Sequence, residues 1–146
     1  MDTGQISALL HEQNFRLTRE RQEVLGLFVN SPKMVTPMQL HEEAKKSNIR
    51  VGLTTVYRLL EVLTKVGLAT PLLLQGTVYY TFCSEHHHHH FVCLKCHRIQ
   101  NIYECPKFET LPPNCEISFH KVDLFGTCAH CAHLSGKGDE KEGLFS

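Results

Sequence analysis

Four cysteines form two Cys-x-x-Cys pairs, with 31 residues between the pairs. A tight turn lets such a pair present two thiolates to one ion, and two pairs together can close a tetrahedral Zn²⁺ site without an open position. A closed site of this kind is structural rather than catalytic. The alternative is one redox-active pair and a coincidence, but a doubled motif is more specific than a single one. We therefore predict one structural zinc per chain, bound by Cys93, Cys96, Cys128 and Cys131.

Five consecutive histidines precede the first cysteine pair. If they belong to a strand that leads into Cys93, their side chains alternate between its two faces, and one strand can supply two different metal sites. A solvated polar run is the alternative, because histidine is also an ordinary surface residue. An expression tag is disfavoured, because the run is internal and leads directly into an apolar segment. The expected faces are His86, His88 and His90 on one side, and His87 and His89 on the other.

Cys83 lies five residues before His88, close enough in the chain to reach the same ion as His88 and His90. A thiolate with two imidazoles is a soft donor set, which suits Zn²⁺ better than Fe²⁺ or Mn²⁺. The other interpretation of Cys83 is a small buried apolar residue, a common fate of a cysteine outside a motif. We predict a second metal site at Cys83, His88 and His90.

The first 67 residues have the pattern of helices. Thr18 and Thr36 are predicted N-caps, with Gln39 as a capping-box partner, and Gly67 is placed to end the last helix. Two short strands flank Gln75–Gly76 and predict a hairpin. Helices followed by a hairpin are typical of a winged helix-turn-helix.

The helix expected over residues 54–67 has two faces. Its apolar face contains Val56, Leu59, Leu60 and Leu63, and its polar face contains Thr54, Tyr57, Arg58 and Glu61. Arginine can reach guanine edges or phosphates, and tyrosine and threonine can contact phosphate or a thymine methyl group. A solvated helix face is the alternative. The predicted DNA-binding residues are Arg16, Arg19, Arg21, Thr54, Thr55, Tyr57 and Arg58.

The second half of the chain predicts short strands over residues 86–93, 97–103 and 116–126, with a brief helix around 107–111. The fold class is therefore α+β. We expect a DNA-binding domain over residues 1–83, a metal-binding domain over 84–134, and a disordered Gly-rich, charged tail over 135–146.

Length, composition and motifs limit the classes of function that the chain can have. The 146 residues leave no room for a large enzyme scaffold, no apolar run approaches the roughly 18 residues of a membrane span, and no secretory signal is evident, so a cytoplasmic location is expected. A zinc enzyme such as a deaminase would need a His-x-Glu motif and a proline before Cys-x-x-Cys, but Glu85 precedes the histidines and no proline precedes Cys93. A zinc-ribbon interaction module without DNA binding is the third hypothesis, and the winged-helix order argues against it.

Together these residues resemble the ferric uptake regulator family of metal-sensing bacterial repressors, over about residues 6 to 134. The segments "FRLTRERQEVL" and "TTVYRLLEVLTKVGL" resemble the family's helix signature, and "HHHHFVCLKC" with "FGTCAHC" resembles its dimerisation signature. The resemblance implies a C-terminal α/β dimerisation domain and a homodimer whose metal-loaded form binds operator DNA and blocks transcription. No membrane partner is expected.

Within the family, Cys83 followed by His88 and His90 is most similar to the sensing site of zinc uptake regulators. Met34 stands where many members have a sensing histidine, and Asn101 where a carboxylate is frequent. The resemblance therefore implies a zinc-responsive repressor, with an iron-, manganese- or peroxide-responsive member as the alternative.

The resemblance also implies an additional metal site at His87, His89 and His120. Further candidate ligands for it are His86, Glu104 and Glu109. The fourth sensing ligand stays open between His86, Glu104 and Cys105.

Overall fold

The computed structural model describes residues 2–83 and 87–134, which form two compact units. The predictions for His86 and for the tail over 135–146 lie outside the described residues. No helix in the described part of the chain is long and apolar enough to cross a bilayer.

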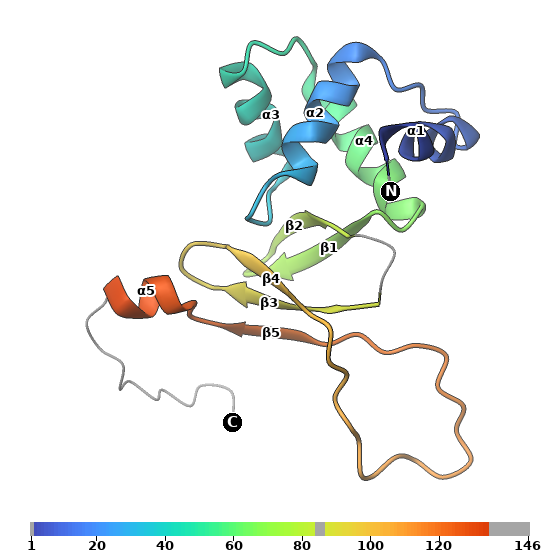
Figure 1. The fold of residues 1–146 in the computed structure, drawn as a ribbon, viewed down its shortest axis with the longest axis vertical. Coiled ribbons are helices and arrows are strands. Elements are labelled where there is room, and N and C mark those ends of the chain that lie inside the picture. Colours follow the sequence, from blue (N-terminus) through green and yellow to red (C-terminus); the bar gives the residue numbers. More distant parts are fainter. Residues whose placement is uncertain (1, 84–86, 135–146) are drawn as a thin grey trace. The chain divides into compact units, whose positions relative to one another are not determined.

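The first unit consists of helices followed by a two-stranded antiparallel sheet (Figure 1). The strands are joined in register from Ala69 opposite Phe82 to Leu74 opposite Thr77. This order confirms the predicted winged helix-turn-helix. The elements are α1 (Thr3–Glu12), α2 (Arg19–Val29), α3 (Pro37–Lys46), α4 (Leu53–Lys65), β1 (Ala69–Leu74) and β2 (Thr77–Phe82).

Side-chain caps start the second and third helices where the sequence predicts. The Thr18 hydroxyl accepts a hydrogen bond from the Arg21 backbone N–H at 3.4 Å. The Thr36 hydroxyl accepts one from the Gln39 N–H at 3.1 Å, and the Gln39 side chain accepts one from the Thr36 N–H at 2.9 Å. This reciprocal capping box satisfies donors that the first helical turn would otherwise leave unpaired.

Several described turns have a left-handed backbone, and in two of them a glycine provides it. Gly67 follows the last turn of α4 with a φ of +83°, the usual role of glycine after a helix. In the hairpin, Gln75 and Gly76 have φ values of +51° and +80°. Positive φ at both central residues is the requirement of a type I′ turn, which matches the twist of the flanking strands.

The core of the first unit forms around α4. Its predicted apolar face is buried, whereas Tyr57 on the opposite face is 42% exposed. The wing joins this core through Phe82, whose ring lies edge-on to Phe28 of α2 at 6.2 Å between centroids. The buried residues of α4 are Val56, Leu59, Leu60, Val62 and Leu63.

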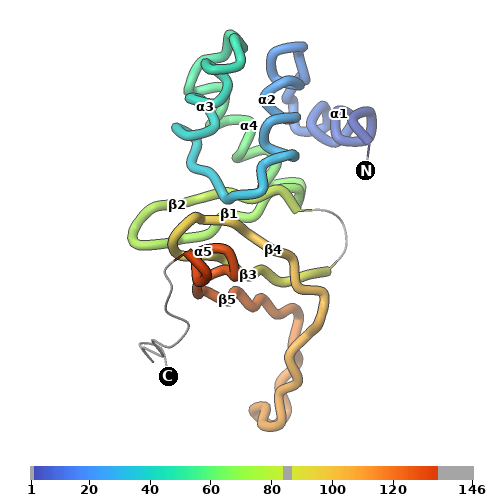
Figure 2. Tube along the Cα trace, turned by 60° about the vertical axis from the view of Figure 1, so that its left-hand side comes forward, coloured from blue at the N-terminus to red at the C-terminus, as the bar shows by residue number. Residues whose placement is uncertain are grey.

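The second unit is a three-stranded sheet with a short helix after its last strand. Strand β3 is central, antiparallel to β4 and parallel to β5 (Figure 2). The histidine run therefore leads into the most buried strand of this unit. The elements are β3 (His89–Cys93), β4 (Ile99–Ile102), β5 (Asp123–Gly126) and α5 (Ala129–Leu134).

Residues 103–122 contain neither helix nor strand, so two expectations are wrong: the helix around 107–111 and the strand before Asp123 (Figure 1). Pro106, Pro112 and Pro113 lack the N–H that either structure would use. A five-residue helix also needs packing to offset its nucleation cost, and Phe108 is 56% exposed.

Candidate metal centres and DNA-binding surface

The four cysteines of the two Cys-x-x-Cys pairs meet in the second unit. Cys93 ends β3, and Cys128 immediately precedes α5. The four Sγ atoms all lie within 4.8 Å of one another. The Cys96 and Cys128 Sγ atoms are 3.8 Å apart. Four sulfurs around zinc at bonds of about 2.3 Å would be separated by about 3.8 Å, so this set fits a tetrahedral ion.

Backbone N–H groups favour the thiolate form of Cys93, which is the form that binds a cation. Burial raises the pKa of the Cys93 thiol, but N–H groups of Cys128, Cys96 and Lys95 more than offset it, which leaves a pKa of about 6. The Cys128 N–H donates to the Cys93 Sγ at 3.4 Å. Burial and the neighbouring thiols raise the pKa of Cys131 to about 12. Cys93 thus holds a thiolate readily, whereas Cys131 gives up its proton when a cation offsets the accumulated charge.

His88 and His90 form a pair on one side of the histidine run. Their Nε2 atoms are 3.1 Å apart, close to the roughly 3.3 Å expected for two imidazoles bound to one zinc. His90 is buried, and its Nδ1 lies 3.4 Å from the Asp123 carboxylate of β5. A carboxylate behind an imidazole orients the ring for a metal. The pKa of His90 is lowered by burial and then by His88, which favours the neutral form that a ligand needs.

His87 and His89 lie together with His120 and Cys105, and one ligand atom of each is within 4.8 Å of the others. The Nε2 atoms of His87 and His120 are 3.2 Å apart. Burial, followed by His87 and His120, lowers the pKa of His89. The alternation expected along the run thus divides its described histidines into two groups.

Among the described residues, three candidate ligands lie outside the groups for which they were predicted. Glu104 and Glu109 belong to none of the candidate metal clusters among the described residues, and Cys105, which the sequence left open for the sensing site, lies with His87, His89 and His120. The grouping of Cys105 with these three histidines could not be predicted, because Cys105 belongs to no metal-binding motif. The conformation of the segment between β4 and β5 determines where the Cys105 thiol lies.

Cys83 follows β2 in the first unit. Its side chain is 6% exposed, and its Sγ lies 2.9 Å from the Thr70 hydroxyl. Its N–H donates to the Leu68 carbonyl at 3.0 Å. A buried Cys83 is compatible with a metal ligand and with a small buried apolar residue. Its role as a ligand therefore stays a prediction.

The polar face of α4, predicted to bind DNA, is largely exposed. Thr54 and Arg58 are exposed, Tyr57 is 42% exposed, and Thr55 is half-buried. The opposite face of the helix is buried in the core, so these side chains are presented on a fixed support.

The three arginines near α2 differ in their surroundings. The Arg21 guanidinium donates to the Arg16 carbonyl at 2.8 Å and lies over the Phe15 ring at 4.6 Å, so it stabilises the turn before α2. Arg19 forms an exposed ion pair with Glu23 at 3.4 Å. The Arg16 side chain is exposed.

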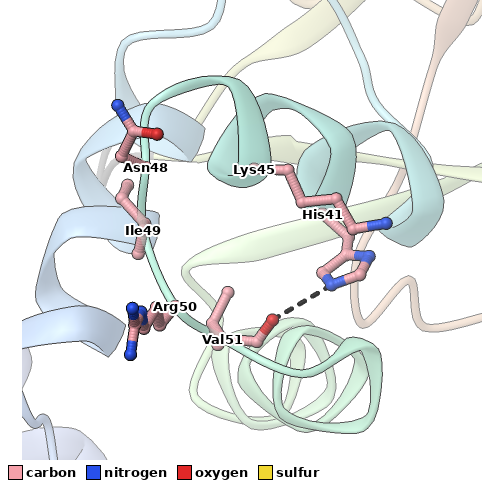
Figure 3. Close-up of a pocket in the computed structure, with 6 residues that line it drawn as sticks. All are labelled: His41, Lys45, Asn48, Ile49, Arg50 and Val51. Atoms are coloured by element: carbon pink, nitrogen blue, oxygen red, sulfur yellow. Dashed lines mark hydrogen bonds between the residues drawn. The ribbon is translucent and has the colours of Figure 1, made fainter.

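A surface hollow lies beside the turn between α3 and α4 (Figure 3). The His41 ring points towards the Val51 carbonyl, and its Nε2 lies 3.0 Å from that oxygen, which connects α3 to the segment before α4. Lys45 and Arg50 contribute cationic groups to this hollow, and neither is among the predicted DNA-binding residues. The lining residues are His41, Lys45, Asn48, Ile49, Arg50 and Val51.

A winged helix with an exposed Arg-Tyr face, followed in the chain by a unit with clustered cysteines and histidines, defines a metal-binding DNA-binding regulator. The model of the ferric uptake regulator family matches residues 12–121. The chain belongs to this family, whose members are metal-responsive transcription regulators rather than enzymes.

Curated relatives support the same assignment. The ferric uptake regulation protein of Staphylococcus epidermidis is 30% identical over 134 residues, which cover 90% of this chain and 96% of that protein. The Staphylococcus aureus protein of the same name is 28% identical over 134 residues and covers 90% of this chain and 98% of its own.

Solved structures share the fold. The ferric uptake regulator of Francisella tularensis, determined with iron, has 26% identity, covers 80% of this chain and 94% of its own, and superposes with a TM-score of 0.61. A zinc uptake regulator complexed with zinc and DNA has 19% identity, covers 92% of this chain and 95% of its own, and has a TM-score of 0.61.

Proposed function

We propose that this protein is a zinc-responsive transcriptional repressor that binds operator DNA as a metal-loaded homodimer in the cytoplasm. It would contain one structural zinc at the four cysteines and an exchangeable sensing zinc. His88 and His90 would bind the sensing ion, with Cys83 as third ligand on the basis of its donor chemistry and its distance of five residues along the chain from His88.

The observation that carries this proposal is the orientation of His90. Its Nδ1 is held near Asp123, while its Nε2 is 3.1 Å from the His88 Nε2, so the pair presents two nitrogens at a separation suited to one ion. The Asp123 carboxylate contacts Nδ1 and so orients the His90 ring. The proposed metal donors are therefore two imidazole nitrogens and one thiolate sulfur, without a carboxylate. Such a set favours Zn²⁺ over Fe²⁺ and Mn²⁺.

Exposed apolar side chains of the second unit support the proposed homodimer. They lie on β5 and the preceding segment, and burying them against a second copy would be favourable. The exposed fractions are 58% for Ile117, 84% for Phe119, 49% for Leu124 and 43% for Phe125.

Metal can act as a switch only if it binds the DNA-competent state more tightly than the other state. Cys83 belongs to the winged-helix unit, whereas His88 and His90 belong to the second unit. An ion bound by all three would restrict how the DNA-binding unit is oriented, and therefore the spacing of the two α4 helices in a dimer.

The test is DNA binding at buffered free metal concentrations. A duplex is first selected from a random pool by the metal-loaded protein, and gel shifts are then recorded against free Zn²⁺, Fe²⁺ and Mn²⁺. We expect Zn²⁺ to activate at the lowest free concentration. Activation by Fe²⁺ or Mn²⁺ at a lower concentration would contradict the zinc assignment and favour the iron- or manganese-responsive alternative. The names of the curated relatives refer to ferric uptake.

A further inference from the structure

The His41 side chain connects α3 to the chain that leads into α4. His41 belongs to α3, and its Nε2 lies 3.0 Å from the carbonyl oxygen of Val51, ten residues further along the chain (Figure 3). A carbonyl oxygen only accepts hydrogen bonds, so Nε2 must carry a proton and donate the bond. The ring is half-buried, where a hydrogen bond is stronger than in open water. His41 thus anchors the residue before Gly52 to the side of α3.

Helix α4 begins without the kind of cap that the other helices of the first unit have. In α1, α2 and α3 the side chain of the residue before the helix accepts a hydrogen bond from a backbone N–H of the first turn. Gly52 precedes α4, and no side chain of the described residues caps this helix. A cap helps to fix where a helix begins, so the start of α4 depends more on the preceding segment. The capping residues of the other helices are Asp2, Thr18 and Thr36.

Two attachments to α3 hold the turn between α3 and α4. At the end of α3, the Ile49 N–H donates to the Ala44 carbonyl at 2.9 Å, and the Ile49 side chain is 8% exposed. The second attachment is the bond from His41 to the Val51 carbonyl, which lies closer to α4. Without it, residues 50–52 would be able to rotate between the buried Ile49 and the first turn of α4. The second attachment is therefore the one that bears on the orientation of α4.

The side chains expected to contact DNA lie close to this anchor. Thr54, Tyr57 and Arg58 are exposed on α4, within about two helical turns of Val51. A binding group must be held within about 0.5 Å and 10–20° of its productive geometry. A shift in the first turn of α4 carries these three side chains with it. Loss of the His41 bond would therefore impair base recognition without removing any group that contacts DNA.

We propose that His41 is a positioning residue for operator recognition, which orients the first turns of α4 through its hydrogen bond to the Val51 carbonyl. It acts through the backbone before α4 rather than by contacting DNA. The inference rests on the proposed function, in which the protein binds operator DNA, and on the expected contact between the polar face of α4 and that DNA. It adds to this face a residue of another helix that contributes to sequence specificity.

Two substitutions in the full-length, zinc-loaded protein separate the hydrogen bond from the packing of the ring. His41→Phe keeps a ring but removes the donor, whereas His41→Gln places an amide N–H as many bonds from Cα as the histidine Nε2. Anisotropy measures the affinity of each variant for the selected duplex and for a duplex of scrambled sequence. We expect His41→Phe to lose about fivefold in affinity for the selected duplex only, and His41→Gln to stay within about twofold of wild type. Loss of stability alone would not produce this split between the two duplexes in a folded variant.

Urea unfolding confirms that each variant is folded in the assay, and His41→Leu serves as a second donor-free variant. His11→Phe, at an exposed histidine of α1, is the matched control and should bind both duplexes as wild type does. Wild-type affinity for the selected duplex in the donor-free variants, or an equal loss in His41→Gln, would overturn the positioning role. If Arg58→Ala still weakens binding in that case, the proposed function stands and only the role of His41 falls. A wild-type protein that prefers neither duplex would overturn the proposed function, and this inference with it.

Discussion

The side chains of His88 and His90 meet on one side of the chain as it enters β3, and those of His87 and His89 meet on the other. Because strand side chains alternate, neighbouring residues can serve different ions without sharing a ligand. Asp123 contributes to the first pair by holding the His90 Nδ1. The electrostatic environment of each histidine therefore depends on the face it occupies.

Arg58 is the residue on which DNA recognition by α4 is expected to depend most. Arg58→Ala should weaken operator binding by about 1–3 kcal/mol if the guanidinium reads a base edge, with the circular dichroism spectrum unchanged. Fluorescence anisotropy on a selected duplex measures the effect. Arg98→Ala is the control, because Arg98 is an exposed arginine of the second unit. Equal operator affinity in wild type and Arg58→Ala would remove this face from the DNA interface.

At this scale, the grouping of cysteines within motifs could be predicted, and the grouping of the isolated Cys105 with histidines could not. The spacing of Cys93 and Cys96 restricts both thiols to one turn, so the sequence alone predicts the four-cysteine group. Cys105 lies 12 residues after Cys93 on a stretch without regular structure, so no period or motif predicts its partners. Its position depends on tertiary contacts.

Among the elements, those of the first unit follow local signals closely. The capping box at Thr36, the left-handed residue Gly67 and the turn at Gln75–Gly76 were all predictable, because each depends on a few adjacent residues. Helix α5 was missed, since it is only six residues long and starts beside Cys128 of the metal group. The sequence predicted more helix and strand in residues 103–122 than the structure contains. Short apolar runs have the pattern of strands even where nearby prolines disfavour backbone hydrogen bonds between strands.

Two glycines of the first unit should respond to alanine with opposite signs. Gly67→Ala is expected to destabilise by about 1 kcal/mol, because its φ of +83° is strained for a residue with a Cβ atom, although the added atom meets nothing within 4 Å. Gly26→Ala, inside α2 and equally uncrowded, should stabilise by roughly 0.5–1 kcal/mol. Urea unfolding measures both. A destabilised Gly26→Ala or an unaffected Gly67→Ala would contradict the backbone argument.

For the whole molecule, the second unit has a small core. Val92 and Cys93 are fully buried, but many apolar side chains around them are exposed. A small unit of this kind often requires a metal for stability. The four cysteines connect the end of β3 with the start of α5, so a bound zinc would link the two ends of the unit.

Removing one thiolate from this site should therefore disrupt folding or dimerisation. Cys131→Ser is expected to give aggregated or monomeric protein with less zinc per chain, whereas Cys115→Ser, outside the site, should remain dimeric. Size-exclusion chromatography with light scattering and metal analysis measure the outcome. A soluble, dimeric Cys131→Ser protein that binds the operator would show that the four-cysteine zinc is dispensable.

The double variant His88→Ala/His90→Ala tests the central claim, zinc control of DNA binding, most directly. Operator affinity is measured by anisotropy at buffered free zinc, with His11→Ala, an exposed histidine of the first unit, as control. Wild type and the control should gain roughly 5- to 150-fold in affinity with zinc. The double variant should stay a folded dimer with zinc at its four cysteines, yet show no zinc-dependent gain. A double variant that still binds the operator in response to zinc as wild type does would contradict the account.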